Sequence, residues 1–116
     1  MIETKLFARL APLVDGRLFP GVAPEGTQTP YMVFTIVSQP LSFTLAGPDG
    51  DGNANVQLTC WSDDHVQALE TAKALLDEAT RSGAEGFGCA GAQRIPDDHQ
   101  AGLYGIGWEF TLTPLE

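Results

Sequence analysis

The chain has 116 residues, and we expect residues 1–116 to form a single domain. Fifteen acidic and six basic residues give a net charge of −9, which argues against a protein that grips DNA or RNA phosphates. Cys60 and Cys89 form no CxxC pair, and the opening MIETKLFARL has no long apolar core. These features predict a reduced cytosolic protein without a zinc knuckle, signal peptide or membrane span, with both thiols packed inside.

The first third of the chain predicts one helix and two strands. Apolar residues at helical spacing predict a helix over 2–14, with an irregular last turn at Pro12. RLFP (17–20) predicts a brief strand, and GVAPEGTQTP (21–30) predicts a loop. YMVFTIVS (31–38) predicts a strand with two largely apolar faces. Such a strand is central in its sheet, or a helix or another subunit covers its second face.

A second helix is predicted between two further strands. NVQLTCW (55–61) alternates apolar and polar residues, which is typical of a half-buried strand. The helix is expected to run from Ser62 to about Arg81, with Ser62 or Asp63 as its cap. Its predicted buried stripe consists of Val66, Leu69, Ala72, Leu76 and Ala79.

The end of the chain predicts two more strands. The first lies near 87–95, the stretch IPDDHQAG (95–102) reads as a turn, and LYGIGWEFTLT (103–113) is the last strand. The order helix, strand, strand, helix, strand, strand predicts an α+β fold. We expect an antiparallel sheet with two helices packed on one face.

The stretch PDGDGN (48–53) resembles the start of a calcium loop, because Asp49, Asp51 and Asn53 stand at alternating positions. The pattern then fails, since Ala54 stands where the loop needs glycine and Cys60 where it needs glutamate. The glycines and proline instead predict a flexible link over about 40–54.

Two Asp-Asp-His triplets are the strongest candidates for metal or acid–base chemistry. They supply two histidines and four carboxylates, a set that binds zinc or iron in proteins. The first triplet (63–65) also fits a helix start, and the second (97–99) fits a turn. A small cytosolic metal-dependent enzyme or ligand-binding domain is therefore the alternative function.

Other catalytic motifs are weak. GFGCAG (86–91) spells GxGxxG, but it follows a helix end and lacks the strand–helix context of a dinucleotide site. Cys60 lies mid-strand on the apolar face, which predicts an inert core thiol. We therefore expect no enzyme activity, no catalytic residues and no cofactor.

Two longer stretches carry a family resemblance. GRLFPGVAPEGTQTPYMVFTIVS (16–38) resembles a signature of the tail-completion proteins of long-tailed bacteriophages: GR-hydrophobic-P, then AP-x-GT-x-x-PY and an apolar strand. NVQLTCWSDDHVQALETAKALLD (55–77) resembles the same family's strand ending in tryptophan, followed by its long helix. The family pattern has a basic residue near position 55, where this chain has Asn55, so a charge contact there is in doubt.

The resemblance implies a tail terminator or tail-to-head joining protein, as found in phages and gene transfer agents. Such proteins form a ring, usually of six subunits, on the head-proximal end of the tail tube. The implied partners are copies of the chain itself, the tail tube protein and the head–tail connector, while DNA passes through the lumen without specific binding. The implied location is the virion tail, assembled in the host cytoplasm, with no membrane partner. The predicted interface residues are Leu45, Asp49, Asp51, Asn53, Asn55 and Trp61.

Overall fold

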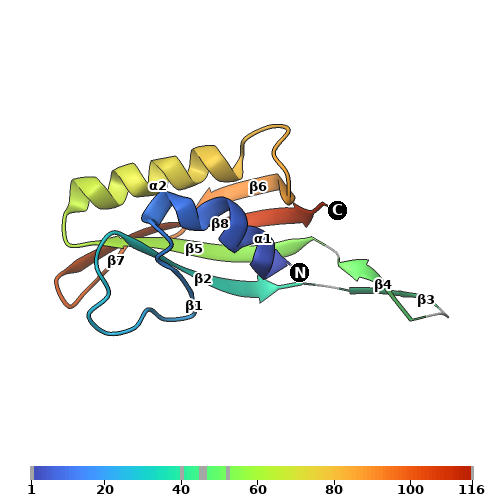
Figure 1. The fold of residues 1–116 in the computed structure, drawn as a ribbon, viewed down its shortest axis with the longest axis horizontal. Coiled ribbons are helices and arrows are strands. Elements are labelled where there is room, and N and C mark those ends of the chain that lie inside the picture. Colours follow the sequence, from blue (N-terminus) through green and yellow to red (C-terminus); the bar gives the residue numbers. More distant parts are fainter. Residues whose placement is uncertain (1, 40, 45–46, 52, 116) are drawn as a thin grey trace.

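The computed structural model describes residues 2–39, 41–44, 47–51 and 53–115, with side-chain surroundings outside 41–51. It is an α+β domain with a six-stranded sheet and two α-helices, which confirms the predicted fold class (Figure 1). The helices are α1 (Ile2–Leu10) and α2 (His65–Ala79), with a 3₁₀ turn, η1, over Ala11–Val14. The strands are β1 (Leu18–Pro20), β2 (Tyr31–Ser38), β3 (Leu41–Thr44), β4 (Gly47–Asp51), β5 (Ala54–Ser62), β6 (Phe87–Arg94), β7 (Asp98–Gln100) and β8 (Leu103–Pro114).

The main sheet has the strand order β1-β2-β5-β8-β6, and β7 pairs with the start of β8. All pairs are antiparallel except β1 with β2, so the sheet is mixed at one edge. The parallel pair arises because the loop 21–30 carries the chain back to the start of β2. The second triplet was predicted in a turn, but Asp98 and His99 lie in β7, and the turn follows at 101–102.

The N-terminal helix ends irregularly, as predicted at Pro12. The α-helix stops at Leu10, and the 3₁₀ turn η1 continues to Val14. Asp15 then adopts a left-handed conformation with φ of 51°, and the Gly16 N–H donates to the Ala11 carbonyl at 2.8 Å. The helix buries Ile2, Leu6 and Leu10 against the sheet.

The second helix begins later than predicted, and of its predicted stripe only Ala72 and Ala79 are fully buried. Asp64 is its cap, instead of Ser62 or Asp63, and its carboxylate accepts from the Val66 N–H at 3.0 Å. Val66 and Leu69 of the predicted stripe are exposed (58% and 38%). The buried residues are Ala68, Ala72, Leu75 and Ala79.

Small side chains explain this orientation of α2. Three buried alanines let the helix backbone approach the sheet closely, and the Trp108 indole fills the space beneath it. The Trp108 Nε1–H donates to the Ala72 carbonyl at 2.9 Å. A larger residue on the buried side would separate the helix from β8, so tertiary packing outweighs the apolar periodicity.

The thiols were predicted to lie in the interior, and one of them does. Cys60 is fully buried in β5, whereas Cys89 in β6 is half-buried. The difference follows from position, because β5 is central and β6 is the last strand of the sheet.

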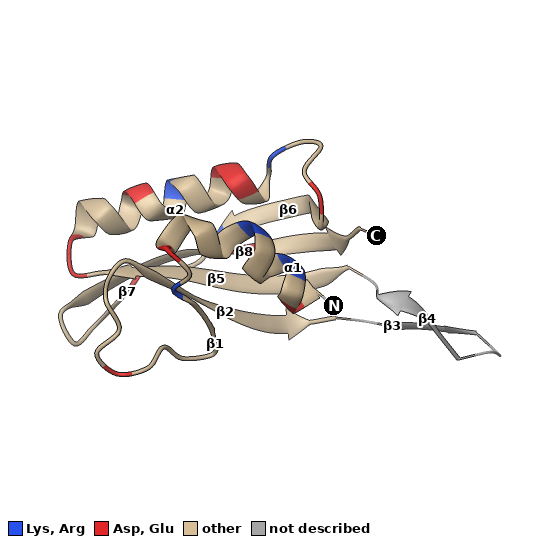
Figure 2. Ribbon diagram, viewed as in Figure 1, with Lys and Arg blue, Asp and Glu red and all other residues tan. Residues whose placement is uncertain are grey.

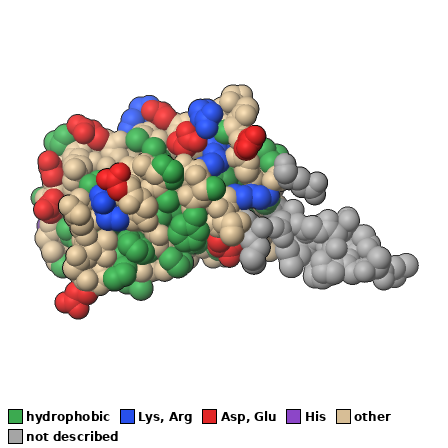
Figure 3. All heavy atoms as spheres, viewed as in Figure 1, with side chains coloured by type: hydrophobic (Ala, Val, Ile, Leu, Met, Phe, Trp, Pro, Cys, Tyr) green, Lys and Arg blue, Asp and Glu red, His purple; other side chains and the backbone are tan. Residues whose placement is uncertain are grey.

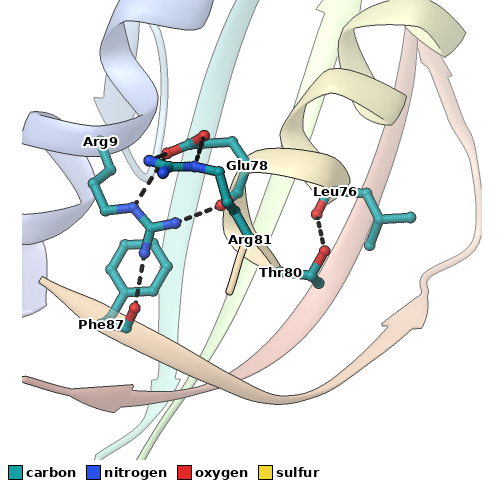
Figure 4. A network of polar contacts seen from close by, with 6 residues as sticks. All are labelled: Arg9, Leu76, Glu78, Thr80, Arg81 and Phe87. Carbon is teal, nitrogen blue, oxygen red and sulfur yellow. Dashed lines mark hydrogen bonds and ion pairs between the residues drawn. The ribbon is translucent and has the colours of Figure 1, made fainter. Parts of the chain in front are cut away.

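Arg9 connects α1, α2 and β6 beneath the loop 80–86 (Figure 4). Its side chain is only 9% exposed, and it donates to the Phe87 carbonyl at 2.8 Å and to the carboxylate and carbonyl of Glu78. The guanidinium also lies 4.0 Å from the centroid of the Phe87 ring. Arg81 bonds the same Glu78 carboxylate from the exposed side, and it lowers the pKa of Glu78.

The predicted flexible link over 40–54 contains two strands. β3 and β4 pair antiparallel with each other in a separate two-stranded sheet, which extends beyond the end of β2 in Figure 1. The predicted flexibility of this segment stays a prediction. Among the described residues, no helix is long and apolar enough to span a bilayer.

Candidate docking trough on the open face of the sheet

Both helices pack on one face of the sheet, so the other face is open. Strand alternation places Tyr31, Val33 and Thr35 of β2 on this open face, with every second residue of β5 and β8. Glu109 is the only charged residue that these three fully described strands place there. The remaining charge lies mostly along the helices and connecting loops (Figure 2).

A depression, called here the trough, occupies one end of the open face. Its volume is about 420 Å³. Apolar and polar uncharged side chains line it together, and the loop after β1 forms one wall. The lining residues are Gly21, Val22, Ala23, Tyr31, Val33, Thr35, Gln57, Thr59, Trp61, Gln100, Ala101 and Leu103.

Two aromatic residues from neighbouring strands line the trough. Tyr31 begins β2 and Trp61 lies near the end of β5, and the two are direct cross-strand partners. The Tyr31 ring also contacts the Phe19 ring edge-on, with centroids 6.3 Å apart. Burial raises the pKa of the Tyr31 phenol.

The absence of a side chain at Gly105 makes room for the Trp61 ring. Gly105 of β8 is the cross-strand partner of Trp61 on the other side of β5. A Cβ at Gly105 would lie 2.8 Å from the Trp61 Cη2 atom, so the indole lies directly over the glycine backbone. Trp61 therefore lies across the strands as a flat floor of the trough, instead of standing away from the sheet.

The motif AP-x-GT forms the turn that carries the trough wall. The Thr27 N–H donates to the Pro24 carbonyl at 3.2 Å across a four-residue turn. Gly26 stands at its third position with φ of 80°, a conformation that glycine adopts readily in type II turns. The Gly21 N–H anchors the start of this loop on the Phe34 carbonyl at 2.9 Å.

The other end of the open face carries ladders of amides and hydroxyls. Asn55 donates to the Ser38 hydroxyl and accepts from the Thr111 hydroxyl, both at 2.8 Å. Next to this ladder, Gln57 and Gln93 donate to the two carboxylate oxygens of Glu109 at 3.1 and 3.4 Å. Each ladder crosses three strands, so these side chains are held in fixed orientations toward solvent.

The predicted interface residues fall into three places. Trp61 lies in the trough, and Asn55 lies in the amide ladder. Asn53 is exposed and accepts from the Thr113 hydroxyl at 2.9 Å. The backbones of Asp49 and Asp51 belong to β4, but their side chains, and all of Leu45, lie outside what the structure describes.

The sequence did not identify Val22 and Leu103, which line the trough, or Gly105, which lies against the Trp61 ring. Val22 and Leu103 come from a loop and a strand start, and nothing in their local sequence marks them. Gly105 did carry a signal, because a glycine inside an apolar alternating strand indicates close approach of another group. That group, Trp61, can be named only once the strand register is known.

The two Asp-Asp-His triplets are closer than their sequence separation suggests. The His99 ring stacks on the Tyr104 ring at 4.6 Å between centroids, and the His65 ring meets the same tyrosine at 5.1 Å. The imidazoles thus join the start of α2 to β7 through one aromatic ring. Within the described ranges, no three histidine, cysteine, aspartate or glutamate side chains gather in a group that could hold a metal ion.

No protein-family model matches the sequence, and no curated protein matches it. Among solved structures, the chain is similar to one described as "Virion of native gene transfer agent (GTA) particle". That similarity has a TM-score of 0.49 and 15% identity, and it covers 97% of this chain and 90% of the other. A likeness this distant does not establish a shared function.

Proposed function

We propose that the protein is a structural component of a tailed phage or gene transfer agent particle. Its role is tail terminator or tail-to-head joining protein, in a ring on the head-proximal end of the tail tube. One observation carries the proposal: the two stretches that resemble the tail-completion family, 16–38 and 55–77, meet at one place. They form neighbouring strands, and the tyrosine of PY (Tyr31) pairs with the tryptophan that closes the second stretch (Trp61).

The meeting of these two stretches supports the proposal because their residues form part of the solvent-exposed surface as well as part of the core. The AP-x-GT turn, Tyr31 and Trp61 all build or support the trough, which is open to solvent on the exposed face. Residues that serve only the core would not need to meet on that face. A solvent-facing trough with aromatic residues and neutral polar groups suits a protein–protein contact.

The charge of the chain suits a ring through which DNA passes. A net charge of −9 per subunit becomes about −54 for six subunits. Such a ring repels the phosphate backbone, so DNA moves through the lumen without specific binding. The proposed partners are other copies of the chain, the tail tube protein and the head–tail connector.

The β3–β4 ribbon is the proposed docking arm. A two-stranded ribbon is at best marginally stable alone in water, so a partner surface is expected to order it. Deleting residues 47–53 is expected to leave the main sheet folded and to abolish assembly of joined particles. Circular dichroism of the purified variant checks the fold, and wild-type yields of joined particles would contradict the arm's role.

The decisive experiment is electron microscopy of particles from a source strain that lacks this gene. Overlong tail tubes without heads establish a terminator, and normal tails beside detached filled heads establish a joining protein. Intact, infectious or transducing particles would refute the virion role. Metal analysis of the purified protein tests the alternative, because stoichiometric zinc or iron would favour chemistry at the Asp-Asp-His triplets.

A further inference from the structure

The main sheet ends in a long edge strand, β6. This strand pairs with β8 on one side, and no described strand lies on its other side. Its residues from Ala90 to Arg94 are all exposed. An unpaired edge of this kind presents a row of N–H and C=O groups that can accept another strand.

The usual protection against such pairing is weak in β6. Natural edge strands carry proline, lysine or inward-pointing charges, or they are very short. The segment from Gly88 to Gln93 contains no proline and no charged residue, and five of its six residues are glycine, alanine or cysteine. The register shift between Cys89 and Gly91 disturbs only its first half. Gly91–Arg94 therefore remains a regular and accessible segment.

The opposite edge of the sheet is only half covered. β1 pairs with Met32, Val33 and Phe34 of β2, and the Gly21 N–H bonds the Phe34 carbonyl. Beyond that point no described strand flanks the segment Thr35–Ser38 on this side.

Exposed apolar side chains accompany this second free edge. Val37 in the free segment is 51% exposed, and Phe7 of α1, whose ring meets the Phe34 ring edge-on, is 37% exposed. In the view of Figure 3, which looks onto the helices, hydrophobic side chains gather along the lower side of the molecule, where Figure 1 places β1 and β2. Pairing another strand here would remove apolar surface from water as well as satisfy backbone groups.

We propose that copies of this chain associate head to tail, with Gly91–Arg94 of one copy pairing to Thr35–Ser38 of the next. This inference deepens the proposed function, because it names the contact between neighbouring subunits of the ring. Thr35 and Gln93 both lie on the open face of the sheet, so placing them opposite each other keeps the open faces of neighbouring copies on one side. The small β6 side chains allow a close approach of the two backbones. The occupant of each edge is thus the other edge of a second copy.

Strand direction supports this pairing. β2, β5, β8 and β6 alternate in direction, so β6 runs opposite to β2. A copy rotated about an axis along the strands therefore brings its β2 antiparallel to the first copy's β6. Pairing β6 with another β6 would leave both β2 edges free, whereas head-to-tail pairing satisfies both edges and can close into a ring.

The test uses two cysteine variants of the purified full chain, both in a Cys89→Ser background. One carries Thr35→Cys and the other Gln93→Cys, each an exposed position on the open face of its edge strand. The proteins are oxidised separately and as a mixture, and disulfide-linked dimers are counted on a non-reducing gel. We expect dimers in the mixture, at least tenfold above either protein alone.

A second pair of variants tests the mechanism of association. Ala92→Lys places a charge in the β6 segment and is expected to abolish the mixed dimer. Gln28→Lys adds the same charge in the exposed loop 21–30 and is expected to leave it unchanged. Multi-angle light scattering follows the same variants, with oligomers expected for the control and monomers for Ala92→Lys.

The other outcomes overturn the proposal. Dimers from Gln93→Cys alone would mean β6–β6 pairing, and dimers from Thr35→Cys alone would mean β2–β2 pairing. A protein that stays monomeric and unlinked at its highest soluble concentration would refute self-association through these edges. The proposed function is judged separately by the gene deletion: overlong or headless tails with no mixed dimer would refute only the edge contact. Mixed dimers with intact particles would refute only the virion role.

Discussion

Replacing Gly105 with alanine is expected to lift the Trp61 ring from the sheet and to destabilise the protein. The new Cβ would lie 2.8 Å from Cη2 and 2.9 Å from Cζ2 and Cζ3 of the indole. Carbon atoms in contact prefer separations of roughly 3.5–4.0 Å, so the ring has to move by about 1 Å. Overpacking of this kind typically costs about 1–3 kcal/mol.

Two other glycines provide matched controls for the same substitution. A Cβ at Gly88 meets no atom within 4 Å, so Gly88→Ala is expected to change stability by less than about 0.5 kcal/mol. A Cβ at Gly107 would lie 2.3 Å from the Leu58 carbonyl oxygen, which is backbone and cannot rotate aside. Gly107→Ala is therefore expected to cost more than Gly105→Ala, at or above about 3 kcal/mol.

Urea unfolding measured by far-UV circular dichroism ranks the three variants by their free energy of unfolding. For a chain of this length, a loss of 1–3 kcal/mol lowers the melting temperature by roughly 4–12 °C. Acrylamide quenching of tryptophan fluorescence reports the freed indole in the Gly105 variant. If Gly105→Ala and Gly88→Ala have equal midpoints and equal quenching, Trp61 does not lie on Gly105, and the described floor of the trough is wrong.

Three further predictions concern the interior and its polar network. Arg9→Met is expected to cost about 1–3 kcal/mol in urea unfolding, because it removes the hydrogen bond to the Phe87 carbonyl and the inner partner of Glu78. Arg81→Met, at a side chain that is 58% exposed, is the control and should unfold close to wild type, since Arg9 still bonds Glu78. Equal losses would contradict the network. Burial raises the pKa of the Cys60 thiol to about 12, so at pH 8 Ellman's reagent should modify only Cys89 in the folded chain and both thiols in urea. Rapid reaction of both thiols in the folded chain would show that β5 is accessible. Hydrogen bonding by Arg81 lowers the pKa of Glu78 from 4.5, so Glu78 binds fewer protons in the folded than in the unfolded chain, and its contribution to folding stability is present above pH 4.5 and lost as the pH falls through the lowered pKa. Glu78→Gln should therefore reduce the stability that is lost on acidification below pH 4.5. An unchanged acid profile would disprove this linkage.

The candidate site was only partly predictable from the sequence. Trp61 and Asn55 were named as interface residues, and both lie on the open face. Tyr31 was placed in a strand that is central or has its second face covered by a helix or another subunit. β2 lies between β1 and β5, no described helix covers its second face, and cover by another subunit stays a prediction. The trough combines side chains from a loop, three main strands and β7, and no local pattern states which of these become neighbours.

The second helix shows the limit of periodicity most clearly. Its existence was predicted correctly, but the predicted stripe included Val66 and Leu69, which are exposed. Two overlapping stripes of apolar residues run along this helix, and local sequence cannot choose between them. The choice is made by the small residues that face Trp108 and the sheet, because close packing of helix on sheet favours alanine at the contact.

The two helices and the strands β1, β2, β5, β6 and β8 were determined by the sequence, because their signals are local, whereas β3, β4 and β7 lie in segments predicted as a link and a turn. Alternation over 55–61 and 103–113 sets a period of two, and Pro12, Asp15 and Gly16 end the first helix through their own backbone preferences. The tertiary structure alone decided the parallel pairing at one edge, the open face and the position of Trp61 over Gly105. These features depend on strand order and register, which arise from contacts between residues distant in the chain, and a local period carries no information about them.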